Sequence, residues 1–446
     1  MKPIAIAKRR QSPIKPQNLP ETLIWYYIVG TYVIYFLGAQ YILASLLGFL
    51  LVLYLVWQWW NQTAATPPDE KITIPPSVWV WVVAMLVLEG ATIVSHADFQ
   101  LGLKRFIETF AAWSRTWAIF AIFPLAASLK IRPQIIYRAV CIVCLQSLIL
   151  IIIGSLATLA KIPEISYVSP LGSLPLDGGK IQYEVDLIHS VIDNRLRLFT
   201  PWSPALGLTA NIYFCLILPE QNKQWRWIGI VATITMILGS VSRTAILCLP
   251  TVLLLELILT KFSRGWLQLI AAGFSFIGGL YFPTLIEFIN TLKESVRNFR
   301  AGSSKARDIL ERIALERWWN EAPIWGHGMT EPGPEWLNNV PIGTHHTWFG
   351  LLFTHGLVGS IALATALFWS FIDLLIKAQN HEHARIGLKI VLTLIIFSFS
   401  EHFDGSVFVF WPGLIILGMA FQERQSSYLL PKLASITEPS YLAKRN

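Results

Sequence analysis

The stretch THHTWFGLLFTHGLVGSIALATALFWSFIDLLI, residues 344–376, places a histidine pair, His345 and His346, at the edge of a long apolar run. A helix that crosses a bilayer needs about 20 apolar residues, and residues 347–376 exceed that length. His355 follows inside the run, about 15 Å further along a helix, where we expect it to serve packing. The stretch therefore predicts a membrane-spanning helix that is preceded by two titratable side chains, His345 and His346.

The composition extends this prediction to the whole chain. Of the 446 residues, 54% are hydrophobic and 14% are charged, whereas soluble domains usually carry about 25% charged residues. The mean hydropathy is +0.53. The net charge of +8 is distributed over short loops, as expected for membrane topology, and does not indicate nucleic-acid binding.

The apolar segments predict an all-α, polytopic integral membrane protein with about twelve transmembrane helices. We expect a single transmembrane domain over residues 22–421, with cytoplasmic tails at 1–21 and 422–446. The predicted spans are 22–38, 41–60, 77–95, 109–129, 136–160, 204–219, 227–241, 244–260, 266–289, 347–376, 388–400 and 405–421.

The distribution of lysine and arginine orients these spans. Short cytoplasmic loops carry an excess of these residues, and with both termini inside, every short basic loop falls on one side. Two longer loops, 161–203 and 290–346, then lie outside. Within the second loop, SSKARDILERIALERWWNEAP (303–323) has helical periodicity and predicts an amphipathic helix that ends before Pro323. The basic residues assigned to the inside are Lys130, Arg132, Arg138, Lys223, Arg226, Lys261, Arg264, Lys377, Arg385, Lys389, Lys444 and Arg445.

Four arginines lie where this topology places the outer membrane boundary. Arg243 stands at a very tight turn between two spans, Arg195 and Arg197 precede the sixth span, and Arg115 lies inside the fourth. An arginine near a span indicates function by default, although it can also reach the lipid headgroups. Arginine binds phosphate through two parallel hydrogen bonds. The group therefore favours a phosphate-bearing ligand at the outer face.

The histidine pair completes this pattern. Histidines at the end of a span are often only solvated interfacial residues, but a neutral histidine accepts a proton near pH 7. The outer loops show no acidic cluster suited to a divalent metal, and we expect neither a metal nor a cofactor. Arginines and a histidine together suit a reaction in which a diphosphate leaves and a hydroxyl attacks.

Three motifs, in order, resemble those of the O-antigen ligase and polymerase family of bacterial glycosyltransferases. The first is Ser-x-Ser-Arg-x-Ala at 240–245. The second is Arg307, a helix, and Pro-x-x-Gly-x-Gly at 323–328. The third is His345 followed by Gly-x-x-Gly at 356–359. His346 replaces the asparagine common in the family, and no Pro-Asn pair follows Arg195 or Arg197, so the choice between these two arginines stays open.

The resemblance implies a metal-independent, inverting transfer of a glycan from undecaprenyl diphosphate to a sugar hydroxyl of lipid A–core, at the periplasmic face of the bacterial inner membrane. His345 would deprotonate or position the acceptor, and Arg243 would neutralise the leaving diphosphate. Arg197, Arg195 and Arg307 would bind the donor, and His346 and Arg115 complete the candidate substrate-binding set.

Two other functions fit the sequence. The first is a polymerase of lipid-linked polysaccharide repeats or a transferase to protein, since the motifs do not distinguish acceptors. The second is a transporter of a small anion. Transporters place their charged residues near the middle of the bilayer, whereas a glycan transferase would gather them at one face.

Overall fold

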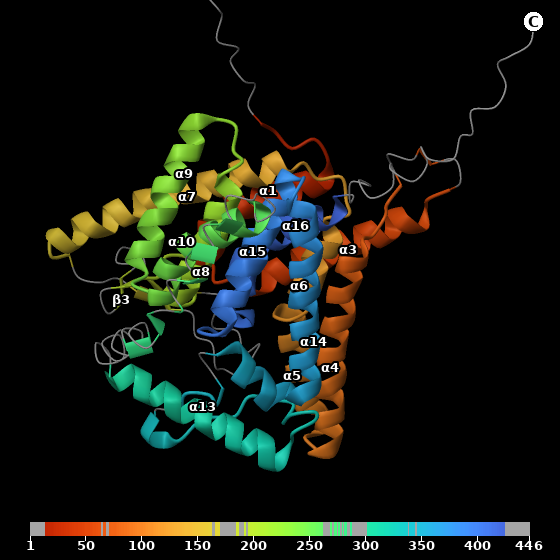
Figure 1. Cartoon of the computed structure of the whole chain (residues 1–446), viewed down its shortest axis with the longest axis vertical. Coiled ribbons are helices and arrows are strands. Elements are labelled where there is room, and N and C mark those ends of the chain that lie inside the picture. The colour runs from red at the N-terminus through yellow and green to blue at the C-terminus, as the bar shows by residue number, and fades with distance from the viewer. Residues whose placement is uncertain are drawn as a thin grey trace, which may run out of the picture.

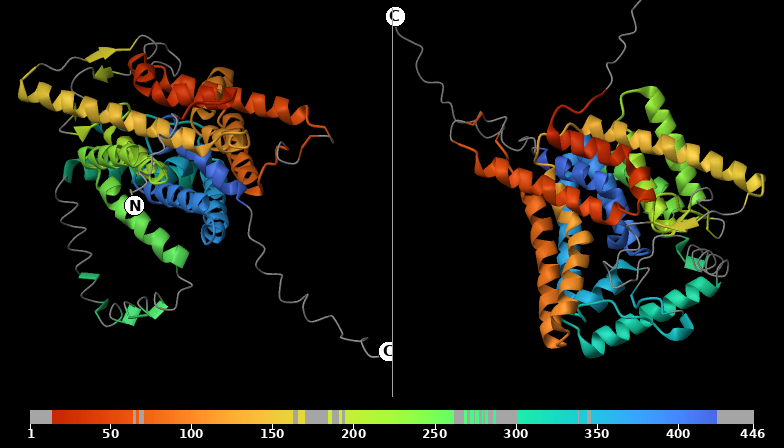
Figure 2. Two further views of the ribbon diagram at one scale, coloured as in Figure 1. Left: turned by 90° about the horizontal axis from the view of Figure 1, so that it is seen from above. Right: turned by 180° about the vertical axis from the view of Figure 1, so that it is seen from behind.

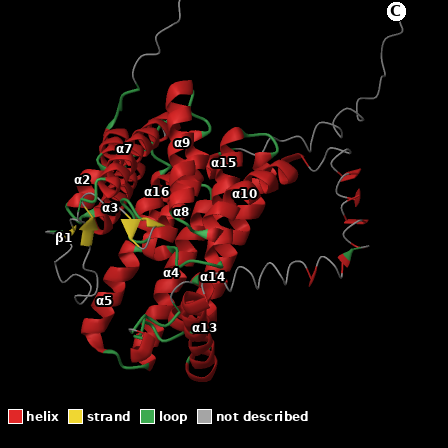
Figure 3. Cartoon of the chain, turned by 90° about the vertical axis from the view of Figure 1, so that its left-hand side faces the viewer, coloured by secondary structure: helices red, strands yellow, loops and turns green. Residues whose placement is uncertain are grey.

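The computed structural model describes residues 14–63, 66–67, 71–162, 166–169, 184–186, 191–192, 195–261, 268–269, 272–273, 275–276, 279, 281–282, 286–287, 301–337, 339–343 and 346–423. This part of the chain is almost entirely helical (Figures 1 and 3). His345, Arg264 and the basic pair at 444–445 lie outside the described residues, as do most of the two predicted tails and of the predicted span 266–289.

The N-terminal half of the chain forms seven described helices. Prolines at their first positions start α4 and α7, where the missing backbone N–H costs nothing, and the side chain of Asn18 caps α1 by accepting from the N–H of Glu21. The helices are α1 (Leu19–Val29), α2 (Thr31–Phe36), α3 (Gln40–Trp60), α4 (Pro76–Asp98), α5 (Gly102–Arg115), α6 (Ile119–Ala126) and α7 (Pro133–Leu159).

The C-terminal half contains a long helix outside the predicted spans, α13, which lies across the lower end of the molecule in Figure 1. It confirms the helix predicted in the second outer loop. The elements are α8 (Ser203–Ile217), α9 (Lys223–Gly239), α10 (Arg243–Lys261), α13 (Ala301–Glu321), η2 (Glu335–Leu337), α14 (Thr347–Ala378), α15 (Glu382–Ser398), η3 (Asp404–Ser406) and α16 (Val407–Gln422).

Four short strands add two antiparallel pairs to the predicted loop 161–203. β1 (Ser166–Val168) pairs with β2 (Glu184–Asp186), and β3 (Val191–Ile192) pairs with β4 (Arg195–Leu196). The prediction treated this segment as loop only. The strands are two or three residues long, which is too short to leave a period-two pattern in the sequence.

Six described helices are long and apolar enough to cross a membrane: α3, α4, α7, α10, α14 and the segment Asp404–Gln422. The protein is therefore a multi-pass, all-α membrane protein, and the count of twelve stays a prediction. Two predicted spans are not single helices. Residues 22–38 divide into α1 and α2 at Gly30, and residues 109–129 divide into α5 and α6. The hydropathy of a segment shows how long and how apolar it is, but it does not show where the helical backbone is interrupted, as it is at Gly30 and between α5 and α6.

The described helices alternate in direction between two ends of the molecule. We call one end the tail face, formed by residues 15–21, 127–138, 220–226, 377–385 and 419–423. There Arg132 pairs with Glu21 at 2.7 Å, and Arg138 pairs with Glu220 at 2.7 Å. Lys377 donates to the backbone of Phe421 at 2.7 Å. The predicted inside loops that the structure describes thus meet at one end.

The other end, which we call the loop face, is formed by residues 195–203, 239–245, 307–328, 346–350 and 399–405. The hydroxyl of Thr347 donates to the backbone of Glu401 at 2.6 Å, and Ser95 at the end of α4 donates to the backbone of Trp325 at 2.9 Å. α3 and α7 run in a similar direction and cross α4 at a steep angle, as the view from behind shows (Figure 2). The loop face collects the segments that carry the predicted site.

Helix α14 is broken at Gly356, where φ is 62° and ψ is −160°. In a regular helix the N–H groups of Leu357 and Val358 would bond the carbonyls of Phe353 and Thr354. Instead, a loop inserts between the two half-helices and satisfies both sets of groups. Leu357 and Val358 donate to Pro323 and Ile324 at 3.0 and 3.1 Å, and His327 and Gly328 donate to Phe353 and Thr354, both at 2.8 Å.

This insertion explains why both motifs contain glycine. A Cβ atom on Gly356 would collide with the carbonyl of Ile324, and one on Gly326 would collide with the backbone of His355 and Gly356. Both residues also have positive φ, which L side chains adopt only at a cost. The two glycines allow the loop after α13 and the broken helix to share backbone hydrogen bonds.

We expect Gly356→Ala to destabilise the protein by at least about 1–3 kcal/mol, because it adds both a strained φ and a steric collision. Gly90→Ala in α4 is the matched control, since a Cβ there meets nothing within 4 Å, and alanine is favoured in a helix by roughly 0.5–1 kcal/mol. Thermal unfolding of both variants in detergent measures the difference. Equal melting temperatures for the two variants would contradict this account of the break.

Candidate functional site

Arg243 lies at the tight turn that the sequence predicts. α9 ends at Gly239 and α10 begins at Arg243, so three residues reverse the chain. Val241 takes a left-handed conformation with φ of 48°, and the hydroxyl of Ser242 accepts from the N–H of Ala245 at 3.4 Å, which caps α10. Arg243 itself is exposed. The turn thus holds the arginine at the first position of its helix, on the loop face.

The small residues of this turn are required by α8, which packs directly against it. A Cβ on Gly207 of α8 would lie 2.5 Å from that of Ala245 and 3.1 Å from the hydroxyl of Ser240. Asn211, one turn further, donates its amide to the backbone of Ala245 at 3.1 Å. The Ser-x-Ser-Arg-x-Ala motif therefore combines an exposed arginine with a buried, small-residue contact that fixes its position.

Arg195 reaches the same turn. It lies on β4, and its Nη2 atom donates to the carbonyl of Val241 at 3.1 Å. The neighbouring Leu196 fills the space above Gly239. Arg197 follows directly, and its carbonyl accepts from the hydroxyl of Thr200 at 2.6 Å. Because Arg195 contacts the backbone next to Arg243, the structure brings these two predicted residues together.

Glu401, which the sequence analysis did not select, connects the remaining segments. It lies between α15 and α16, outside the candidate spans, and is 6% exposed. Burial raises the pKa of its carboxyl group to about 7, while Arg307, a hydrogen bond from Trp202 and Arg195 act to lower it. Its backbone carbonyl holds Thr347 at the start of α14. The charges of Arg307 on α13 and Arg195 on β4 therefore act on one buried carboxyl group beside the histidine segment.

A sequence signal for Glu401 existed. The segment SEHFDG at 400–405 places three titratable side chains between two predicted spans, and ionisable residues at such positions indicate function. Its partners could not be read from the sequence, because Trp202, Arg307 and Thr347 come from three distant segments.

The ionisation of Glu401 gives a pH prediction. Its pKa in the folded state is above the ordinary value of 4.5, so the folded protein binds this proton more tightly than the unfolded chain does. The resulting stability is complete below about pH 4.5 and is lost as the pH rises through about 7, by an amount on the order of 3 kcal/mol. We expect the wild-type melting temperature to fall more steeply between pH 5 and 8 than that of Glu401→Gln. Parallel slopes would contradict the assignment.

His346 has a structural role at the start of α14. Its Nδ1 atom accepts from the N–H of Phe349 at 3.4 Å, so it caps the helix, and its ring packs on that of Phe349 at 4.1 Å. Burial lowers the pKa of its imidazole to about 4. His346 is therefore neutral at physiological pH. His345, the predicted catalytic residue, precedes this cap but lies outside the described residues.

The two remaining residues that the sequence analysis singled out, His355 and Arg115, are both buried. His355 is buried at the break in α14 and bonds the hydroxyl of Thr354 at 2.7 Å, which agrees with a packing role. Arg115 is buried at the end of α5, where its Nε donates to Ala111 at 2.9 Å and its guanidinium lies 4.8 Å from the ring centroid of Tyr41. Neither of these two contacts of Arg115 involves Glu401 or its neighbours, so they do not place Arg115 with the other predicted residues.

An ion-pair network anchors the C-terminal end of α13. Arg317 pairs with Glu321 at 2.8 Å and also with Glu331, and His327 bonds Glu321 at 2.8 Å. Arg317 and, to a smaller degree, His327 lower the pKa of Glu321 to about 2. Because His327 belongs to the loop inserted into α14, the network fixes the helix that carries Arg307 relative to the histidine segment.

The loop face thus carries Arg195, Arg243 and Arg307, and the charges of Arg195 and Arg307 act on the buried carboxyl group of Glu401 next to the start of α14. Guanidinium groups suit the binding of an anionic phosphate group. In the part of the chain that the structure describes, no group of three or more His, Cys, Asp or Glu residues could hold a metal ion. The prediction of metal independence has yet to be tested.

Comparison with known proteins agrees with the motifs. Residues 228–364 match a family model described as O-antigen ligase. This range contains Arg243, Arg307 and both histidines of the pair, and excludes Arg195, Arg197 and Arg115. No curated protein matches the chain. The match shows an O-antigen ligase domain over residues 228–364 and supports a membrane enzyme of O-antigen ligase or polymerase type.

Proposed function

We propose that the protein is an O-antigen ligase, which transfers a glycan from undecaprenyl diphosphate to a sugar hydroxyl of lipid A–core. The observation that supports this most directly is the environment of Glu401, whose buried carboxyl group is influenced by the charges of Arg307 and Arg195 and whose backbone carbonyl accepts from Thr347 at the start of α14. Arg195 in turn bonds the turn that carries Arg243. Positive groups for a diphosphate thus lie on the same face as His346, the residue that follows the proposed catalytic His345 in the sequence.

The chemistry follows from these groups. His345 removes the proton of the acceptor hydroxyl as it attacks the anomeric carbon, and the bond to the diphosphate breaks with inversion. Arg243, together with Arg195 or Arg197, stabilises the charge that develops on the leaving diphosphate, the task that a metal ion performs in other enzymes. Arg307 binds the donor, and Glu401 orients Arg307 and Arg195. The assignment of His346 and Arg115 to substrate binding stays a prediction.

The same proposal orients the protein in the bacterial inner membrane. The tail face, with its excess of lysine and arginine, would be cytoplasmic, and the loop face periplasmic. The described arginines of the proposed site gather at the loop face, as expected for transfer between lipid-anchored substrates at the membrane surface. A small-anion transporter would place them near the middle of the bilayer.

One experiment tests the reaction, its side and its metal independence. Right-side-out vesicles that hold the protein and the lipid-linked donor are given lipid A–core and excess EDTA from outside. We expect glycan-bearing lipid A, seen by its slower migration on a gel. Product only in inverted vesicles would refute the orientation, and loss restored by Mg²⁺ would refute the arginine mechanism. Growth of the lipid-linked glycan in place of transfer would identify a polymerase.

A further inference from the structure

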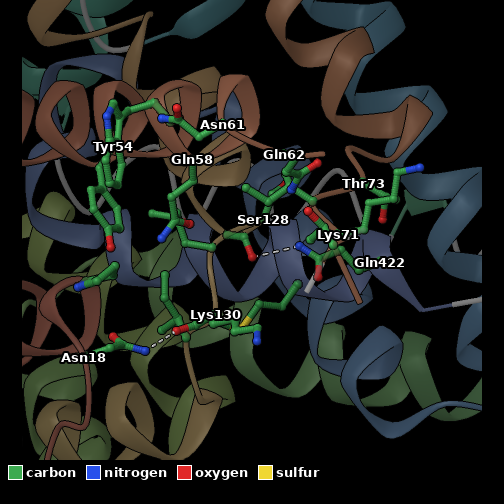
Figure 4. A pocket seen from close by; sticks show the side chains of 18 residues that line it. Asn18, Tyr54, Gln58, Asn61, Gln62, Lys71, Thr73, Ser128, Lys130 and Gln422 are labelled. Carbon is green, nitrogen blue, oxygen red and sulfur yellow. Dashed lines mark hydrogen bonds between the residues drawn. The ribbon is translucent and has the colours of Figure 1, made fainter. Parts of the chain in front are cut away.

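A cavity of about 620 Å³ opens at the tail face (Figure 4) and is lined by none of the arginines of the loop face. The end of α3, the segment between α6 and α7, the N-terminal segment and the end of α16 form its walls. Hydrogen bonds join these walls: Asn18 donates to the backbone of Lys130 at 2.7 Å, and Gln422 donates to that of Ala127 at 2.8 Å. The cavity is therefore bounded by packed elements of the fold.

The lining is polar and basic. Amide and hydroxyl side chains line the space in Figure 4, together with the exposed lysines Lys71 and Lys130. None of the lining residues that the structure describes is acidic. Such a lining suits an anion that also carries hydroxyl groups. The polar side chains are those of Asn18, Gln58, Asn61, Gln62, Thr66, Lys71, Thr73, Ser128, Lys130 and Gln422.

An exposed apolar stripe on α3 leads to this cavity. Leu46, Leu50, Leu53 and Trp57 follow a spacing of four, three and four residues, which places them on one side of the helix, and they are 47–65% exposed. α3 is one of the candidate spans, so we expect this exposed apolar side to face lipid chains. Trp57 belongs both to the stripe and to the cavity wall, and Trp60 just beyond it is 85% exposed, as is common at the membrane–water boundary.

We propose that this cavity binds the headgroup of an anionic glycerophospholipid. Its phosphate lies with Lys71 and Lys130, its headgroup hydroxyls bond the amides and hydroxyls of the wall, and its acyl chains lie along the α3 stripe. Basic pockets between spanning helices recognise lipid headgroups in this way. The site is separate from the proposed transfer reaction, and holds whether or not the chain is a ligase.

Native mass spectrometry of the detergent-purified full chain tests the site, with phosphatidylglycerol, phosphatidylcholine and soluble glycerol phosphate as probes. We expect the wild type to prefer phosphatidylglycerol. Lys71→Gln/Lys130→Gln should weaken that binding about 30-fold, since each lysine contributes about 1 kcal/mol and 1.4 kcal/mol is tenfold. Lys223→Gln/Lys261→Gln removes the same charge outside the cavity and should keep the preference.

Three outcomes would overturn the proposal: an unchanged preference in the Lys71/Lys130 variant, equal binding of the two lipids by the wild type, or binding of glycerol phosphate as tight as that of the lipid. The last result would identify a soluble phosphate ligand. A thermal melt of each variant without added lipid shows whether it is folded, and a single Lys71→Gln variant replaces the pair if the double variant is not.

Discussion

Replacing His345 with alanine is expected to lower glycan transfer by about 10²–10⁴-fold, the range that general-base catalysis contributes. The reason is that a sugar hydroxyl is a poor nucleophile until its proton is removed, and we propose that His345, which directly precedes the N-cap residue His346 in the sequence, removes it. Donor binding should be retained. Transfer from a lipid-diphosphate glycan to lipid A–core, with donor binding measured in parallel, checks both statements.

The neighbouring histidines are the controls. His346→Ala removes a helix cap, which typically costs about 0.5–2 kcal/mol, and His355→Ala removes a buried contact at the α14 break. Both should reduce the melting temperature more than the turnover of folded enzyme. Normal transfer by His345→Ala together with loss in His346→Ala would show that the other member of the pair is catalytic. Normal transfer by both His345→Ala and His346→Ala would show that neither histidine is catalytic and that the pair only lies at the membrane interface.

Arg243→Ala is expected to reduce transfer by about 10²–10³-fold or more, since loss of one group that stabilises developing charge has effects of that size. The residue is exposed, while Ser240, Ser242 and Ala245 make the buried contacts of the turn. The fold should therefore tolerate the change, with a melting temperature near that of the wild type. The assay is again transfer, normalised to folded protein.

Arg312→Ala is the matched control for Arg243→Ala. Arg312 lies on α13, is 71% exposed and faces Glu316 at 3.9 Å, and such surface pairs contribute little. It removes one positive charge from the same face without touching Glu401. If Arg312→Ala lost as much transfer as Arg243→Ala, the requirement would be for net positive charge at this face and the specific role of Arg243 would be wrong.

The sequence by itself determined the features that depend on local pattern. Apolar length identified α3, α4, α7, α10 and α14, because burial of the backbone in lipid requires continuous apolar segments. Helical periodicity identified α13. Two predicted spans, 227–241 and 244–260, are separated by only two residues, and this spacing identified the turn at Arg243. The three motifs, which depend on residue types in order along the chain, indicated the O-antigen ligase domain that matches residues 228–364.

The tertiary structure alone decided how these segments meet. The carboxyl group of Glu401 is influenced by the charges of Arg307 on α13 and Arg195 on β4, and its backbone carbonyl accepts from Thr347 of α14. No local pattern encodes interactions between such distant segments. The inserted loop at Gly356 was also hidden, because it exchanges the helix's own hydrogen bonds for bonds to Pro323 and Ile324 while the hydropathy stays that of one continuous span. Local pattern fixes which segments lie in the membrane, whereas backbone and charge pairing across the fold determine which side chains share a site.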